Sequence, residues 1–340
     1  MQVDLGLPKL KRLPDLARSC CEGLRFHAEN LFVKGQRGRD IGNCQYQVIQ
    51  RGNRGRWRVL RHGAILGYGD GMKDDAPQEE CQSDQMDVAR ANALLAALGR
   101  PETLANGDAL PPFFHQVYFW TPQPPAALGR DGHPKVGGLI PDMGLPRRMW
   151  AGGQLMFETP LIAGLPALRR STCRDHVRKE GRSGPLGFVT LCHEIRQGDH
   201  LRLQEHQDLV YRADPDPSAP RPEAPISTRS AADRVEVQFD ATLLFRYSAL
   251  TFNGHRIHYD ETYARTVEGY DGLVVHGPLL AQLLMLRAAE QLGPLARFRF
   301  RATAPLMHHE TGWLCRDGTD LWVEGPDKRL CMRAEVEVKD

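Results

Sequence analysis

One apolar segment constrains the fold of this 340-residue chain more than any other feature. Residues 273–289 (LVVHGPLLAQLLMLRAA) are apolar on nearly every side, and a helix that is hydrophobic all round is buried. The segment is shorter than the roughly 20 apolar residues that cross a bilayer. Pro278 suits the first turn of a helix, so the helix is expected to start near His276 and Gly277. The rest of the chain must supply a surface that encloses it.

Strand-like stretches lie on both sides of this segment. They cover 154–160, 167–179, 186–196 and 201–211 before it, and 296–304, 312–316 with 320–324, and 330–338 after it. A less apolar helix is predicted at 87–98, with Asp84 or Ser83 as its N-cap. A helix followed by long antiparallel strands thus occurs twice. The pattern predicts an α+β chain of two halves, each a sheet wrapped round one helix.

Four regions follow from changes in composition. They are a basic extension at 1–80, a first half at 84–213 with a Pro/Gly-rich cover at 101–153, a linker at 214–226 and a second half at 227–340. Between 34 and 61 the extension has basic residues and a single acid, Asp40, so a nucleic-acid patch is conceivable. A solvated or poorly folded extension is the preferred interpretation. Met86 is an alternative start of the natural chain.

Several classes of function are disfavoured by composition. A net charge of +2 gives no overall case for nucleic acid, and the 8 Cys form neither Cys-x-x-Cys nor zinc spacing. Neither GxGxxG nor a phosphate-binding Lys-Ser/Thr loop is present, so we expect no cofactor and no metal. The chain lacks a membrane-length apolar run and a signal core, which predicts a cytoplasmic protein.

A polar motif precedes the apolar segment. It reads Asn253-Gly254-His255-Arg256-Ile257-His258-Tyr259-Asp260, then Tyr263-Ala264, Gly269-Tyr270 and His276-Gly277-Pro278. In spacing it resembles the MaoC-like hydratases, which have a hot-dog fold. The branch it resembles is that of the mesaconyl-CoA and itaconyl-CoA hydratases and the type 2 hydroxyacyl-thioester dehydratases. Blocks that carry this likeness include Leu110-Pro111-Pro112, Leu128-Gly129-Arg130-Asp131-Gly132-His133-Pro134 and Trp150-Ala151-Gly152-Gly153. The resemblance covers about residues 84–340 and implies a double hot-dog fold.

The resemblance also implies roles for the motif residues. His258 is expected to be the acid/base, because imidazole transfers protons at neutral pH. The family has Asp where this chain has Asn253, and an amide cannot titrate, so Asn253 is expected to position water or substrate. Gly277 is the candidate oxyanion donor at the helix start. Three residues are possible supporting groups: Asp260, His255 and His276.

Cationic residues are the candidates for contacts with the rest of a substrate. Arg297, Arg299 and Arg301 alternate along one strand and share a face, which suits CoA phosphates or a carrier protein, although an ordinary solvated face is the preferred account. A dicarboxylic substrate would need a cation such as Arg147 or Arg148. The turn residues Lys179, Arg182 and Ser183 contact phosphate or form a tight hairpin.

The expected activity is reversible hydration of an enoyl-CoA thioester, with a short branched or dicarboxylic acyl group of the mesaconyl-CoA or itaconyl-CoA type. A 3-hydroxyacyl dehydratase acting on acyl-carrier protein is the alternative within the same class. A non-catalytic thioester-binding module and a thioesterase are alternatives from other classes, since a fold does not settle function. The resemblance further implies a homodimer.

Overall fold

The structure is a computed structural model that describes residues 49–51, 57–59, 79–181, 184–216 and 223–339. The chain divides into two compact units, Met1–Met72 and Lys73–Asp340. In the first unit, β1 (Ile49–Arg51) pairs antiparallel with β2 (Trp57–Val59). Most of the predicted basic extension, including its nucleic-acid patch, lies outside the described residues.

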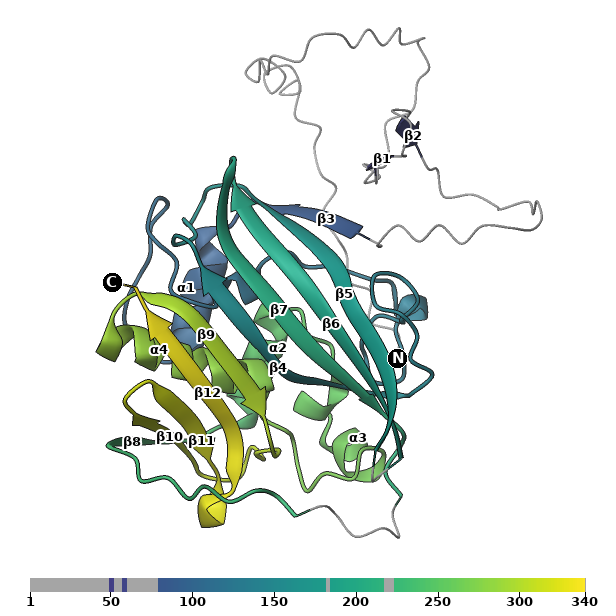
Figure 1. Ribbon diagram of the computed structural model, residues 1–340, viewed down its shortest axis with the longest axis vertical. Coiled ribbons are helices and arrows are strands. Elements are labelled where there is room, and N and C mark those ends of the chain that lie inside the picture. Colours follow the sequence, from purple (N-terminus) through teal and green to yellow (C-terminus); the bar gives the residue numbers. More distant parts are fainter. Residues whose placement is uncertain (1–48, 52–56, 60–78, 182–183, 217–222, 340) are drawn as a thin grey trace, which may run out of the picture. The chain divides into compact units, whose positions relative to one another are not determined.

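The second unit is built on one antiparallel sheet of ten strands (Figure 1). Its order is β3-β5-β6-β7-β4-β9-β12-β11-β10-β8. The first half supplies β3 (Glu79–Asp84), β4 (Arg147–Phe157), β5 (Ala167–Gly181), β6 (Gly184–Gln197) and β7 (His200–Arg212). The second half supplies β8 (Asp233–Val237), β9 (Leu295–Ala302), β10 (Gly312–Asp317), β11 (Asp320–Glu324) and β12 (Leu330–Val338).

The two halves meet where β4 pairs antiparallel with β9, so the sheet is continuous across the junction. Two glycines of β4 allow its two neighbours to approach closely. A Cβ on Gly152 would lie 2.6 Å from the Phe300 carbonyl oxygen of β9, and one on Gly153 would lie 2.5 Å from the His206 carbonyl oxygen of β7. Real Cβ atoms do not approach so closely, so the junction with β9 requires glycine at 152 and the pairing with β7 requires it at 153.

Three helices lie on one face of the sheet: α1 (Val88–Ala97), α2 (Ala241–Leu250) and α4 (Gly277–Leu292) (Figure 1). The short α3 (Glu261–Thr266) follows the polar motif. Single turns of 3₁₀ helix are η1 (Phe114–Val117), η2 (Pro125–Ala127), η3 (Arg256–His258) and η4 (Pro326–Lys328). Leu279, Leu284 and Met285 of α4 are fully buried in the main core. The predicted apolar helix is therefore the centre of the second half, and the α+β prediction is confirmed.

The strands follow the predicted pattern closely, and β11 and β12 have the predicted bounds. Three predictions were incomplete or wrong. β4 begins at Arg147 rather than at 154, and β3 and α2 were not predicted. The cap of α1 is Asp87, whose side chain accepts from the Ala89 N–H, and not Ser83 or Asp84. Asp84 instead accepts hydrogen bonds from the backbone N–H groups of Met86 and Phe119.

Met86, the alternative start, is fully buried, and the edge strand β3 precedes it and pairs with β5. The alternative start stays a prediction. Among the described residues, no helix is both long and apolar enough to cross a membrane.

Candidate active site

The polar motif begins at a sharp turn after α2. Phe252 has a φ of 51°, and the Asn253 N–H donates to the Ser248 carbonyl at 2.8 Å. The Asn253 side-chain oxygen accepts from the His255 N–H at 3.0 Å. A left-handed conformation at a bulky residue is costly, so the surrounding structure must stabilise this turn.

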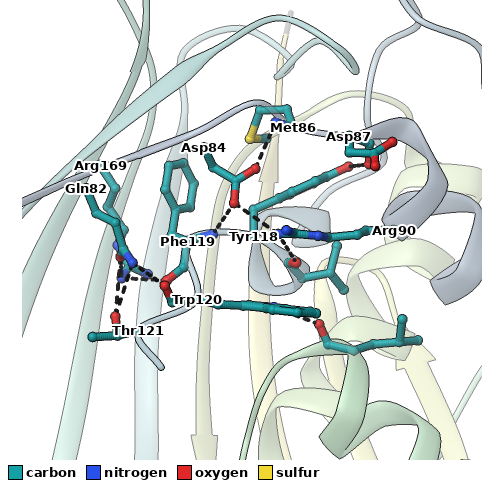
Figure 2. A network of polar contacts seen from close by, with 12 residues as sticks. Gln82, Asp84, Met86, Asp87, Arg90, Tyr118, Phe119, Trp120, Thr121 and Arg169 are labelled. Carbon is teal, nitrogen blue, oxygen red and sulfur yellow. Dashed lines mark hydrogen bonds and ion pairs between the residues drawn. The ribbon is translucent and has the colours of Figure 1, made fainter. Parts of the chain in front are cut away.

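An aromatic and ionic cluster from the first half supports the turn (Figure 2). Trp120 stacks on Phe252 with 5.1 Å between ring centroids, and its Nε1 donates to the Leu250 carbonyl at 3.1 Å. Arg90 lies over Trp120 at 4.2 Å and is paired with Asp84 at 3.0 Å. The Pro/Gly-rich segment therefore fixes the end of α2 and, through it, the position of the motif.

His258 is buried in η3 and has a defined tautomer. Its Nδ1 lies 2.7 Å from the Val274 carbonyl oxygen, so Nδ1 carries the proton and donates. The lone pair of the neutral ring is then on Nε2. Burial lowers the pKa of His258 to about 3, although the Val274 hydrogen bond works against this. At neutral pH the ring is uncharged and Nε2 can accept a proton, as the predicted acid/base requires.

His276 supports His258 and marks the start of α4. The two rings are stacked with centroids 3.6 Å apart, and His276 Nε2 bonds to the Ser248 hydroxyl at 2.8 Å. Its side chain is fully buried, and burial holds its pKa well below the usual range. His276 therefore supports His258 by packing against its ring and is itself buried. Gly277 is the first residue of α4 and borders the cleft, where the helix start presents unpaired N–H groups.

A loop of the first half contacts the motif directly. The Arg256 N–H donates to the Asp131 carbonyl at 2.9 Å, and the His133 and His255 rings are 4.5 Å apart. His255 is in turn 5.4 Å from His258. Burial, then the neighbouring His133 and His258, lower the pKa of His255 far below its usual range. His255 is thus a neutral neighbour of the acid/base.

Asp260 has the structural role that the sequence offered as one alternative. Its carboxylate caps α3 by accepting from the Tyr263 N–H at 2.9 Å and binds Arg256 at 2.7 Å. The N–H and guanidinium hydrogen bonds hold the pKa of Asp260 below its usual value. No direct contact with His258 is recorded for it in the described part of the chain.

Several of these residues border a cleft of about 1730 Å³ between the two halves. Its walls include Asn253, His258 and Gly277 from the motif, and His133 and Arg148 from the first half. The cleft is large enough for a thioester with part of its carrier, since ligand pockets commonly measure about 300–1,000 Å³.

The two candidate cations before the junction differ in what they contact. The Arg147 guanidinium binds the Glu268 carboxylate at 2.5 Å, so its charge is already balanced. Arg148 borders the cleft, and among the described residues it forms no ion pair with a carboxylate. Burial raises the pKa of Tyr211, and Arg148 beside it has the opposite effect. Arg148 is therefore the better candidate for a substrate carboxylate.

The other predicted substrate contacts lie apart from the acid/base. Arg297, Arg299 and Arg301 are exposed on one face of β9, as predicted, and Arg297 is paired with Glu337. Arg299 and Arg301 line a second hollow of about 410 Å³, and Arg301 also borders the main cleft. Lys179 lies over the Phe188 ring at 5.6 Å. Arg182 and Ser183 lie outside the described residues.

Comparison with known families identifies the chain. The model of the hydroxyacyl-thioester dehydratase type 2 family matches residues 113–308. The mesaconyl-C(4)-CoA hydratase of Chloroflexus aurantiacus is 44% identical over 75% of this chain and 93% of its own length. This chain belongs to the hydroxyacyl-thioester dehydratase type 2 family. The predicted resemblance is confirmed.

Further relatives of the family agree on fold. The mitochondrial type 2 hydroxyacyl-thioester dehydratase of Schizosaccharomyces pombe is 27% identical over 65% of this chain and 82% of its own. The crystal structure of HtdX from Mycobacterium tuberculosis covers 77% of this chain and all of its own, with a TM-score of 0.55 at 16% identity. A MaoC-like dehydratase from Phytophthora capsici covers 78% of this chain and 97% of its own, with a TM-score of 0.54 at 12% identity. The double hot-dog fold is confirmed.

The sequence interpretation gave no role to Asp131 and His133. Both were noted only as part of a family block, although Asp131 bonds His133 beside the motif. The donor atoms of Asp131, His133 and His255 lie within 4.8 Å of one another, a spacing that metal ligands also have. The sequence does show a carboxylate two residues before a histidine. It gives no signal that this pair lies close to a motif more than 100 residues away.

Proposed function

We propose that this protein catalyses reversible hydration of an enoyl-CoA thioester. The observation that carries the proposal is the state of His258, a neutral imidazole whose Nδ1–H is held by Val274 and whose Nε2 is left as acceptor. His258 borders the same cleft as Gly277 at the start of α4. Membership of a dehydratase family supports this reaction class.

The reaction follows from this arrangement. His258 Nε2 accepts a proton from water as the water oxygen bonds to C3 of the enoyl group. The electron pair of the double bond moves toward the thioester oxygen, where N–H groups at the start of α4, with Gly277 first, stabilise the negative charge. The imidazolium then returns the proton to C2. Dehydration is the reverse sequence. Asn253 positions water or substrate.

A short dicarboxylic acyl group is the proposed substrate. A buried or half-buried carboxylate needs a cation, and Arg148 offers one at the cleft. The 44% identical relative is named for a dicarboxylic thioester, mesaconyl-C(4)-CoA. Arg299 and Arg301 line the second hollow, and Arg301 also borders the cleft; both are proposed to meet CoA phosphates, because a fork of N–H donors suits a phosphate. Acyl-carrier protein as partner, a homodimer and a cytoplasmic location stay predictions.

The test is loss of the enoyl-thioester absorbance with a panel of enoyl-CoA esters. Wild-type protein should consume mesaconyl-type esters, and His258→Ala should lower kcat by about 10²–10⁴-fold. His200→Ala, at the exposed first residue of β7, serves as the control. Free CoA released without hydration would indicate a thioesterase. Binding of every ester without turnover would indicate a binding module and point to Asn253 as the cause.

A further inference from the structure

Asn253 leaves the site without the carboxylate that the resembled motif has at this position. An amide does not titrate and carries no charge. The imidazolium that forms on His258 would therefore have no negative partner in the motif itself, since Asp260 caps α3 and binds Arg256. The family carboxylate also holds the reacting water, and a group from another part of the chain can take that place.

The loop 129–133 of the first half brings a carboxylate and an imidazole to this place. The Asp131 carboxylate accepts from His133 Nδ1–H at 3.0 Å with one oxygen and from the His133 backbone N–H at 3.1 Å with the other. Both oxygens thus hold the same residue. The ring is fixed, and Nε2 is left with the lone pair, which is how a carboxylate orients a catalytic histidine.

The loop is locked against the motif. A Cβ on Gly132 would lie 2.0 Å from the Gly254 carbonyl oxygen, so the two backbones are in direct contact. With the bond from Arg256 N–H to the Asp131 carbonyl, this contact determines where His133 lies. His133 borders the cleft, as Asn253 and His258 do.

The charges around His133 suit an acceptor. Burial, then Arg148 on β4, lower the pKa of His133 to about 4, while Asp131 and the Asn253 side chain act in the opposite direction. Burial alone would raise the pKa of Asp131, but His133 lowers it below its usual value, so the carboxylate is ionised. The motif loop presents the neutral rings of His255 and His258 to the same space.

We propose that His133, oriented by Asp131, is the second group that holds the reacting water, opposite His258. This rests on the proposed hydratase function. The water donates one O–H to His258 Nε2 and the other to His133 Nε2. The first bond breaks as oxygen bonds to C3, and its proton passes through His258 to C2. The second stays intact and keeps the oxygen aimed at C3. The ionised Asp131 keeps the His133 ring in this orientation.

The pair explains the contacts without a metal ion. Asp131 and His133 are already bonded to one another through both carboxylate oxygens. A metal ion bound to His133 Nε2 would take the lone pair that otherwise accepts from the water, so the two accounts exclude one another. The experiment separates these accounts.

The experiment restores the family carboxylate. We expect His133→Ala to lower kcat by about 10²-fold with little change in KM, and Asp131→Asn to lower it by about 10-fold. In the double variant His133→Ala with Asn253→Asp, the new carboxylate accepts the water O–H and balances His258. The double variant should therefore be at least about 10-fold faster than His133→Ala alone. The control His200→Ala should equal wild type.

Each outcome bears on one proposal. A wild-type protein without hydratase turnover contradicts the proposed function. An active wild type with equally active His133→Ala overturns the role of His133. Loss in His133→Ala that Asn253→Asp does not recover, together with a lowered melting temperature, makes His133 structural and overturns it too. Loss of activity on dialysis with EDTA, restored by Zn²⁺, assigns the three residues to a metal instead.

Discussion

Replacing Gly132 by alanine tests the contact on which the site depends. Gly132 has a φ of 88°, and an added Cβ would lie 2.0 Å from the Gly254 carbonyl oxygen. The backbone strain of a non-glycine residue costs about 1–2 kcal/mol, and an overpacked contact adds about 1–3 kcal/mol. We therefore expect the free energy of unfolding to fall by about 2–5 kcal/mol in total. We also expect His133 to be displaced.

The matched control is Gly198→Ala. Gly198 also has a positive φ, 57°, but a Cβ there would meet nothing within 4 Å. It carries the strain without the contact, so the difference between the two variants isolates the contact. The contact alone costs about 1–3 kcal/mol, so at about 2–4 °C per kcal/mol for a domain of this size, Gly132→Ala should melt about 2–12 °C below Gly198→Ala.

The assay is thermal unfolding at one scan rate, with kcat measured on the same samples. Gly132→Ala should also lose hydratase activity, because the loop that carries His133 must move. Equal melting temperatures for the two glycine variants would refute the reasoning. So would full activity in Gly132→Ala, since the loop would then not need this contact.

Three further predictions use other parts of the site. Tyr247→Phe should leave the melting temperature unchanged or higher, because the buried hydroxyl has no hydrogen-bond partner among the described residues. Tyr263→Phe should lower it, because that hydroxyl donates to the Glu268 carboxylate at 3.1 Å. Stability should fall between about pH 6.5 and pH 4: the pKa of His258 is lowered in the folded state to about 3, so the unfolded chain binds more protons as the pH falls. The melting temperature should fall less steeply with decreasing pH in His258→Gln than in the wild type, which melting curves across this range would measure. Arg148→Met should raise KM for a dicarboxylic enoyl-CoA and not for a monocarboxylic one, whereas Arg147→Met should lower stability by breaking an ion pair that is mostly buried.

The fold could be predicted where local patterns decide it. Burial alternates residue by residue along most of β6, and this alternation is visible in the sequence. The start of α4 was less certain because the apolar run begins earlier, at Leu273. Val274 and Val275 instead bond to the segment around Leu306 and Met307, so the helix begins only at Gly277. These pairings with distant segments keep Val274 and Val275 out of the helix.

The site was predicted only as far as its residues are neighbours in the sequence. The tautomer of His258 depends on a carbonyl 16 positions later, and His133 lies over 100 positions before the motif. Neither contact has a local signal. Arg147 and Arg148 are adjacent on β4 and both border the cleft, so the alternation of side chains along a strand does not separate their roles. Glu268, which binds Arg147, lies 121 residues later, and the sequence gives no signal of that contact.

The junction of β4 with β9 has a consequence for how this protein could be divided. A cut after Arg212 would give one fragment with Trp120 and His133 and another with His258 and Gly277. Each fragment would present an unpaired strand whose natural partner is in the other, and exposed edges of this kind associate. Activity that returns only on mixing would make the protein a two-component enzyme, in which the half without the motif is a required subunit.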